Sequence, residues 1–249
     1  MNRRCEVRRL HLVTYENGMA MQERLVEMRK ADRIDDQLLL LQHPAVITLG
    51  RAGKIENLLV EGPDLESCGV RFYETTRGGD ITYHGPGQLV GYPILHLGEG
   101  RRDIRKYVWA VEEVLIHVAR DFGVEAERNE AQRGVWVGDE KLAALGVRIS
   151  RWTTSHGFAL NVSSNLDHFR LITPCGIADK GVTSLWGFYA TSPSERATRI
   201  IDRLLDLDAR RIADMDATGI DIAILSLTAP GVQAFEAEEA KAMVVRAND

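Results

Sequence analysis

The sequence has few cysteines and no long apolar run, and each absence excludes a class of protein. Only three cysteines occur among 249 residues, and none belongs to a CxxC pair. Three widely spaced cysteines do not make a disulfide framework, so we expect reduced thiols in a cytoplasmic protein. The longest unbroken apolar run, Tyr107 to Val111, is too short to span a membrane. The first residues also lead into no apolar stretch of the kind that a signal peptide has.

The charge balance shows no excess of basic residues. The chain has 31 Lys and Arg against 36 Asp and Glu, a net charge of -5, which excludes a generally basic nucleic-acid-binding protein. The 45% apolar content is typical of a chain that forms a core. No internal repeat or low-complexity tract occurs. We therefore expect one domain over residues 1–217, followed by an extension of unknown role over residues 218–249.

The hydrophobic pattern favours an α+β fold. Met21, Leu25 and Met28 recur at helical spacing, and Asp103 can cap a helix whose apolar stripe begins at Ile104 and runs over four turns to Val118. Antiparallel strand pairs mixed with such helices indicate the α+β class. The pattern predicts strands at 10–14, 37–42, 45–49, 89–97, 134–137, 142–149 and 157–162, and helices at 16–31, from 104, and from Ser192-Pro193.

A glycine-rich segment, Arg77 to Gly91, could carry chemistry. Glycines let a ligand approach the backbone closely, so the segment could hold an acyl chain or a phosphate. It matches neither the GxxxxGK[ST] nor the GxGxxG nucleotide pattern. A tight loop with a structural histidine explains the same residues. Gly85-Pro86-Gly87 would be costly in a helix or central strand, so we expect a loop or a sheet edge.

The tripeptide Pro174-Cys175-Gly176 could present a thiol at a bend, because proline fixes the backbone and glycine leaves space beside the sulfur. A small buried apolar residue is the alternative, and most free cysteines are of that kind. Cys5 and Cys68 have no comparable setting.

Lys141 follows the predicted turn at Gly138 and falls on an alternating apolar face with Ala143, Leu145 and Val147. Such a lysine either extends its ammonium group to solvent or holds a desolvated amine. A solvated lysine beside a turn is the simpler interpretation. A desolvated one near a cysteine would favour the thiolate and could accept protons.

His156 enters an apolar strand, where it could act as a base or as a hydrogen-bonded structural residue. The seven histidines show no HxH or HxxxH spacing and no cysteine pair. The sequence therefore predicts neither a metal site nor a cofactor.

Four ordered segments together resemble the LipB-type lipoyl(octanoyl) transferases, and a fifth, LLLLQHPAVITLGRAGKIENLL, resembles the early strands of that family. The resemblance covers residues 7 to 205, and only residues 218–249 match no pattern of the family. The four segments are RGGDITYHGPGQLVGYPI (77–94), GVWVGDEKLAALGVRIS (134–150), HGFALNV (156–162) and PCGI (174–177).

The resemblance implies a mixed β-sheet packed with helices, as in the catalytic domain of biotin- and lipoate-protein ligases. It implies transfer of an octanoyl group from octanoyl-acyl carrier protein through a Cys175 thioester, with Lys141 as acid–base partner. His156 would be a pocket residue. The implied substrate-binding residues are Arg77, Gly78, Gly79, Asp80, Ile81, Thr82, Tyr83, His84, Ala144, Leu145, Gly146, His156, Gly157, Phe158 and Ala159.

The acceptors that the resemblance implies are the lipoyl domains of 2-oxoacid dehydrogenase E2 subunits and the glycine cleavage H protein. We expect a cytoplasmic monomer with neither nucleic acid nor membrane as partner. Both protein substrates are expected to be acidic, so Arg77, Arg148 and Arg151 become candidates for a basic docking face. The apolar pocket would have room beside Ala143 and Ala144. Three alternatives remain: an ATP-dependent lipoate-protein ligase, a non-catalytic acyl-carrier-binding module, and a cysteine hydrolase.

Overall fold

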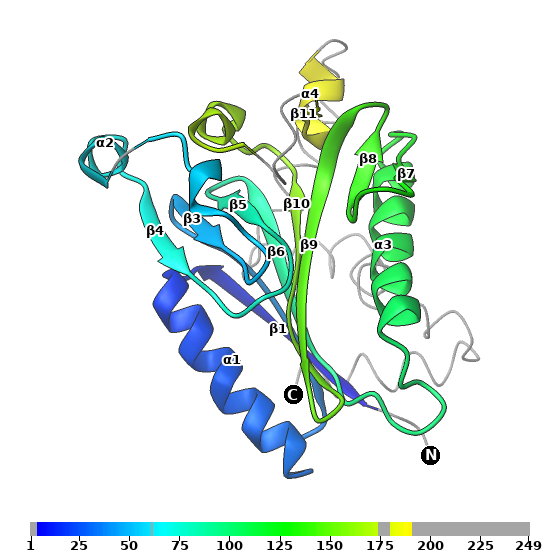
Figure 1. Cartoon of the computed structure of the whole chain (residues 1–249). Coiled ribbons are helices and arrows are strands. Elements are labelled where there is room, and N and C mark those ends of the chain that lie inside the picture. Colours follow the sequence, from blue (N-terminus) through cyan, green and yellow to red (C-terminus); the bar gives the residue numbers. More distant parts are fainter. Residues whose placement is uncertain (1–3, 61, 174–179, 191–249) are drawn as a thin grey trace, which may run out of the picture.

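Two β-sheets and the helices around them build the part of the chain that the computed structural model describes, residues 4–60, 62–173 and 180–190 (Figure 1). Cys175, the helix predicted from Ser192-Pro193 and the extension at 218–249 lie outside these residues. The mixed sheet and its helices confirm the α+β class.

The larger sheet has eight strands in the order β1-β2-β6-β10-β9-β8-β7, with β11 beside β9. The β1–β2 and β9–β11 pairs are parallel and the other pairs are antiparallel, so the sheet is mixed. Its strands are β1 (Cys5–Leu12), β2 (Asp36–Gln42), β6 (Gln88–Ile94), β7 (Glu127–Arg128), β8 (Val135–Val137), β9 (Glu140–Ser150), β10 (Thr153–Asn161) and β11 (Gly181–Val182).

The smaller sheet has three strands in the order β4-β3-β5, namely β3 (Val46–Leu49), β4 (Arg71–Glu74) and β5 (Ile81–His84). Gly85-Pro86-Gly87 forms the turn between β5, an edge strand beside β3, and β6 of the larger sheet, so the loop or sheet edge predicted for these three residues is confirmed. The predicted strands at 37–42 and 45–49 both exist, but they belong to different sheets. The first predicted strand begins earlier than expected, at Cys5.

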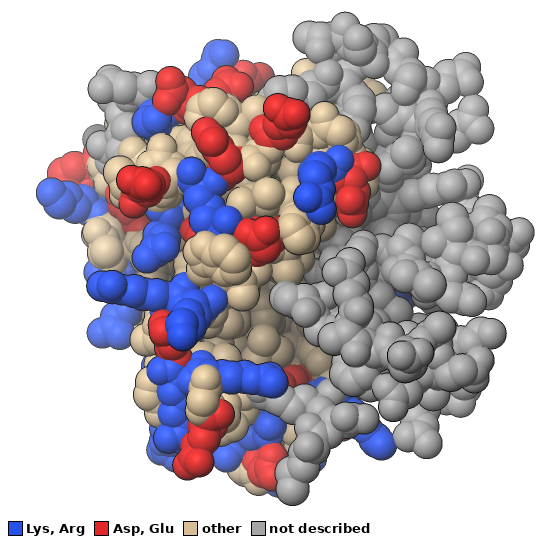
Figure 2. Space-filling model, turned by 90° about the vertical axis from the view of Figure 1, so that its right-hand side faces the viewer, with Lys and Arg blue, Asp and Glu red and all other residues tan. Residues whose placement is uncertain are grey.

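Two long helices cover opposite faces of the larger sheet, α1 (Tyr15–Lys30) on one side and α3 (Ile104–Asp121) on the other (Figure 1). On the face that carries α3, Lys and Arg side chains are interspersed with Asp and Glu (Figure 2). None of the described helices combines the length and apolarity that crossing a bilayer requires. The short helices are η1 (Ile55–Asn57), α2 (Gly62–Ser67), η2 (Leu166–Leu171) and α4 (Leu185–Ala190).

The leucine run of β2 shows why helices cover both faces of the sheet. Leu38 and Leu40 pack in the core beneath α3, whereas Leu39 and Leu41 pack in the core beneath α1. Successive residues of a strand point to opposite faces, so an uninterrupted apolar run needs cover on both sides.

Both predicted ends of α1 and the predicted start of α3 are confirmed to within one residue. The side chain of Thr14 accepts the N–H of Asn17 at the start of α1, and that of Asp103 accepts the N–H of Lys106 at the start of α3. One residue of the predicted α3 stripe was wrong: Ile104 is 51% exposed. It occupies the first turn of α3.

Candidate active site

A cavity of about 420 Å³ lies between the two sheets and gathers most of the predicted site residues. One wall comes from β5 and the segment before it, and the other from β6, β9 and β10. Of the predicted residues, the lining includes Arg77, Gly79, Asp80, Ile81, Thr82, His84, Lys141, Ala144, Leu145, Gly146, His156, Gly157, Phe158 and Ala159.

Gly78 and Tyr83 are the two predicted substrate-binding residues that do not line the cavity. Tyr83 is buried in the core of the smaller sheet, where its hydroxyl lies 2.8 Å from Nδ1 of His168. The N–H of Gly78 bonds to the carbonyl of Val147 and thereby ties the glycine-rich segment to β9.

The sequence analysis missed ten lining residues. Gln88, Tyr92 and Asn161 lie within the four segments that carry the family resemblance, and Ala52 lies within the fifth, so those positions could have indicated them. The others come from segments without a local signal. The ten are Tyr15, Ala52, Gln88, Tyr92, Ala131, Gln132, Arg133, Asn161, Phe169 and Val182.

A β-bulge directs Lys141 into this cavity. Val135 lies opposite Ala143 but Trp136 lies opposite Lys141, so β9 has one extra residue, Leu142. The bulge shifts the alternation by one position, a device that re-aims side chains next to functional sites. Leu142 and Ala143 consequently both pack beneath α3, while Lys141 and Ala144 line the cavity. The prediction that Lys141 shares a face with Ala143 was wrong for this reason, and so was the room expected beside Ala143.

The environment of Lys141 is buried and aromatic. The residue is only 6% exposed, so it is not the solvated lysine that the simpler interpretation expected. Its Nζ lies 4.7 Å from the centre of the Trp136 ring, where a cation is favoured by the negative face of the ring. Strand β11 runs alongside, with Val182 opposite Lys141.

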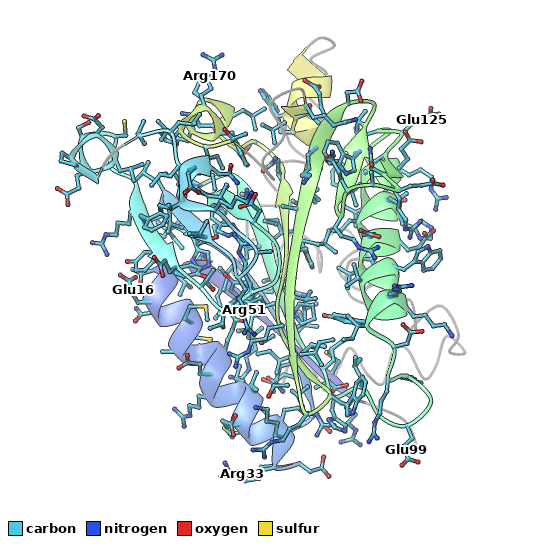
Figure 3. The ribbon with its side chains drawn as sticks, viewed as in Figure 1. Glu16, Arg33, Arg51, Glu99, Glu125 and Arg170 are labelled. Atoms are coloured by element: carbon cyan, nitrogen blue, oxygen red, sulfur yellow. The ribbon has the colours of Figure 1, made fainter. Side chains whose placement is uncertain are left out.

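Arg77 is a structural cation and not part of a docking face. Its guanidinium donates to the carbonyl of Thr48 at 2.7 Å, to the Thr48 hydroxyl and to the carbonyl of Gly78. Only 7% of the residue is exposed. The expectation that Arg77 meets a partner protein was therefore wrong, whereas Arg148 and Arg151 are exposed. Arg170 also points outward, from η2 (Figure 3).

His156 has a strained backbone inside β10. Its φ of 54° lies in the left-handed region, which is costly for a residue with a Cβ. The side-chain oxygen of the buried Gln22 accepts its N–H at 2.7 Å, and this bond holds the backbone from α1. His156 lines the cavity, where the family resemblance places a pocket residue.

Three buried histidines at this end of the cavity are neutral at pH 7. Burial lowers the pKa of His43 and His156 to about 4 and that of His84 to about 3. His43 Nδ1 donates to the carbonyl of Val13, so its Nε2 accepts the Tyr92 hydroxyl at 2.7 Å. His84 Nδ1 donates to the side-chain oxygen of Gln88. Neither these histidines nor any other described residues form a cluster of His, Cys, Asp and Glu that could hold a metal ion.

The neutral histidines predict a loss of stability in mild acid. Their folded-state pKa lies below the unfolded value of 6.5, so the unfolded chain binds more protons as pH falls from 6.5 toward 4. Stability is complete above pH 6.5 and decreases below it, by up to about 1.4 kcal/mol per pH unit for each histidine. Urea unfolding at several pH values measures this slope. His84→Gln should reduce it, with the exposed His11→Gln as the control for loss of an imidazole. An unchanged slope in His84→Gln would contradict the assignment.

Comparison with known proteins gives concordant matches. The family model of the lipoyl protein ligase A/B catalytic domain matches residues 14–205. The octanoyltransferase of Solibacter usitatus is 49% identical over 210 residues, covering 83% of this chain and 95% of the relative. That of Caldicellulosiruptor saccharolyticus is 54% identical over 178 residues, covering 71% of this chain and 76% of the relative.

Solved structures share the fold at low sequence identity. Lipoate-protein ligase A bound with ATP superposes with a TM-score of 0.61 and 16% identity, covering 81% of this chain and 82% of that one. A bipartite lipoate protein ligase from Thermoplasma acidophilum, studied with its E2 lipoyl domain, gives a TM-score of 0.55 at 14% identity. The match covers 99% of this chain and 82% of that one. These likenesses confirm the predicted ligase-type architecture.

Proposed function

Since the chain belongs to the lipoyl protein ligase A/B catalytic-domain family, we propose that it is an octanoyltransferase that moves an octanoyl group from octanoyl-acyl carrier protein to a lysine of lipoyl domains. The acceptors would be the E2 subunits of 2-oxoacid dehydrogenases and the glycine cleavage H protein. The relatives at 49% and 54% identity are octanoyltransferases, whereas the ATP-bound ligase shares only 16% identity and the fold. This difference favours the transferase over the ATP-dependent ligase.

The observation that carries the mechanism is the buried lysine in the cavity wall. A lysine at 6% exposure is unusual without a chemical or structural use. We assign to Lys141 the role of proton donor and acceptor beside Cys175. As a cation it favours the thiolate of a neighbouring cysteine, and once neutral it can accept a proton from an attacking amine.

The described residues on both sides of the cysteine segment support this pairing. Phe169 precedes the segment and Val182 follows it, and both line the cavity that Lys141 also lines. Cys175 precedes Val182 by seven positions, and Val182 lies opposite Lys141 in the sheet. Such a separation allows the thiol to reach the amine.

The proposed reaction has two steps. The Cys175 thiolate attacks the thioester carbonyl, the carrier's thiolate leaves and takes up a proton from the Lys141 ammonium, and an octanoyl thioester forms on the enzyme beside a neutral Lys141. The acceptor lysine then attacks this thioester, gives up a proton to Lys141, and displaces the Cys175 thiolate. Replacing one thioester by another is near thermoneutral and amide formation is downhill, so neither step needs ATP or a cofactor.

The cavity is suited to an acyl chain. Its lining includes the apolar residues Ile81, Leu145, Phe158 and Phe169, and Gly146 and Ala144 leave space beside them. Each buried CH₂ contributes about 0.8 kcal/mol, so an eight-carbon chain supplies much of the binding free energy. The volume of about 420 Å³ lies within the range of small-ligand pockets.

Intact-protein mass spectrometry tests the proposal. The enzyme is mixed with octanoyl-acyl carrier protein without ATP or acceptor, and then given a lipoyl domain. We expect one octanoyl adduct that the lipoyl domain removes and carries as an amide. Acceptor modification only with ATP and free octanoate would support the ligase instead. Binding of the carrier protein without an adduct would support a carrier-binding module. Release of free octanoate in the absence of acceptor would support a cysteine hydrolase.

A further inference from the structure

Both oxygens of the Asp80 carboxylate accept hydrogen bonds from the protein, whose donors lie at the start of β5 and at η1. Its Oδ1 accepts the N–H of Ile81 at 2.7 Å and the N–H of Lys54 at 3.3 Å. Its Oδ2 accepts the side-chain amide of Asn57 at 2.7 Å. Although Asp80 borders the cavity, both oxygens are bonded within the protein, so its contacts are structural ones.

Asn57 passes this connection to the chain that leads to the cysteine. Its carbonyl accepts the N–H of Thr173 at 2.7 Å. The adjacent residues reinforce the contact, since Leu58 bridges Ile172 and the N–H of Leu59 bonds to the carbonyl of Leu171. A continuous path of hydrogen bonds therefore runs from Asp80 through Asn57 to Thr173, two residues before Cys175.

We propose that Asp80 is a positioning residue for the nucleophile, acting through Asn57 to fix the main chain at Thr173. The proposal rests on the function proposed above, in which Cys175 forms the acyl-enzyme. The hydrogen bond from the Asn57 amide to the Asp80 carboxylate is charge-assisted and short, which makes it stronger than a neutral hydrogen bond. A displacement of about 1 Å at a reacting group can lower a rate by up to about 100-fold, so loosening Thr173 should slow the chemistry of the thiol.

Exchanging the two polar groups isolates this path. Asp80→Asn removes the charge and turns the oxygen that faces Asn57 into a donor, so the contact to Asn57 is lost or is re-formed as a weaker neutral bond after the Asn57 amide turns over. Asn57→Ala removes the partner and leaves the Asp80 carboxylate in place. The double variant D80N/N57D exchanges amide and carboxylate, so the hydrogen bond re-forms with its direction reversed.

The measurements are the rate of octanoyl-enzyme formation and the rate of Cys175 alkylation by iodoacetamide. The second rate needs no carrier protein. Both are followed by mass spectrometry in a background with Cys5→Ser and Cys68→Ser. We expect both single variants to slow both rates by about 10-fold or more, with little change in the KM for the carrier. The double variant should recover most of the loss. Asp167→Asn removes an exposed carboxylate near the same segment and is the control for the charge change.

Three results would overturn the proposal: an Asp80→Asn enzyme at the wild-type rate, a slow Asp80→Asn enzyme beside an unaffected Asn57→Ala enzyme, or a double variant no faster than the singles. The second result would mean that Asp80 acts on the substrate directly. Thermal unfolding of each variant separates a slow enzyme from an unfolded one, and Asn57→Ala remains informative if Asp80→Asn fails to fold. A wild-type enzyme that forms no adduct would refute the proposed function instead.

Discussion

Replacing Cys175 by serine is expected to abolish the octanoyl adduct and to lower the transfer rate by about 10³-fold or more. A cysteine with an ordinary pKa of about 8.5 is a few per cent thiolate at neutral pH, whereas a serine hydroxyl stays protonated without a strong base. The serine variant should still bind the acyl carrier protein, because the cavity walls are unchanged. Intact mass after mixing with octanoyl-acyl carrier protein measures the adduct, and a lipoyl-domain assay measures the rate.

Cys68→Ser provides the matched control for this loss of a thiol. Cys68 is a free and exposed cysteine that follows α2 and is not among the residues that line the cavity. The Cys68→Ser variant should form the octanoyl adduct at the wild-type rate and carry that adduct on Cys175. An octanoyl adduct of the usual size on Cys175→Ser would show that another group is acylated, and the thioester mechanism would then be wrong.

The elements that the sequence predicts well are those whose pattern is local. Helix α3 is an example, because Asp103 caps it and its apolar stripe recurs over four turns. The hairpin of β8 and β9 is another, since Gly138 at a φ of 56° makes the turn that its position indicates. In both cases neighbouring residues determine the structure.

The cavity could not be read from local pattern because distant segments form it. Tyr15 comes from α1, Ala131 from the segment before β8 and Phe169 from η2, and no spacing relates them. The family resemblance indicated Lys141 and the glycine-rich segment, but not the structural use of Asp80. That use depends on Asn57 and Thr173, which lie 23 and 93 residues away along the chain.

The bulge in β9 is the clearest case in which tertiary structure overrides the pattern. Strict alternation places Lys141 with Ala143 and Leu145 on the face that α3 covers. The additional residue, Leu142, reverses that assignment, and it is visible only once Val135 and Trp136 are paired with β9. Had the alternation held, Lys141 would lie in an apolar core without access to substrate. The error in the prediction thus marks the feature on which the proposed chemistry depends.

Lys141→Met is accordingly expected to lower the rate of octanoyl-enzyme formation by about 10²- to 10⁴-fold, the usual contribution of a positioned acid–base group. Methionine has a similar length and fills the same buried space beside Trp136, so the fold should persist. Single-turnover acylation, followed by mass spectrometry, measures the effect. Alkylation of Cys175 by iodoacetamide should slow as well, because the nearby cation that favours the thiolate is gone.

Lys180→Met is the control that separates this role from a general effect of charge. Its Nζ lies 5.4 Å from the centre of the same Trp136 ring, but it pairs with Asp139, whose side chain is 83% exposed. Because the carboxylate of this pair is open to solvent, the pair contributes little to stability, so the variant should acylate within about twofold of the wild type. Equal losses in both lysine variants would indicate that Trp136 needs a cation for packing alone. A loss of acylation rate in the Lys141 variant alone would support proton transfer at Cys175. That is the role which the burial of Lys141, the bulge beside it and its position in the cavity favour.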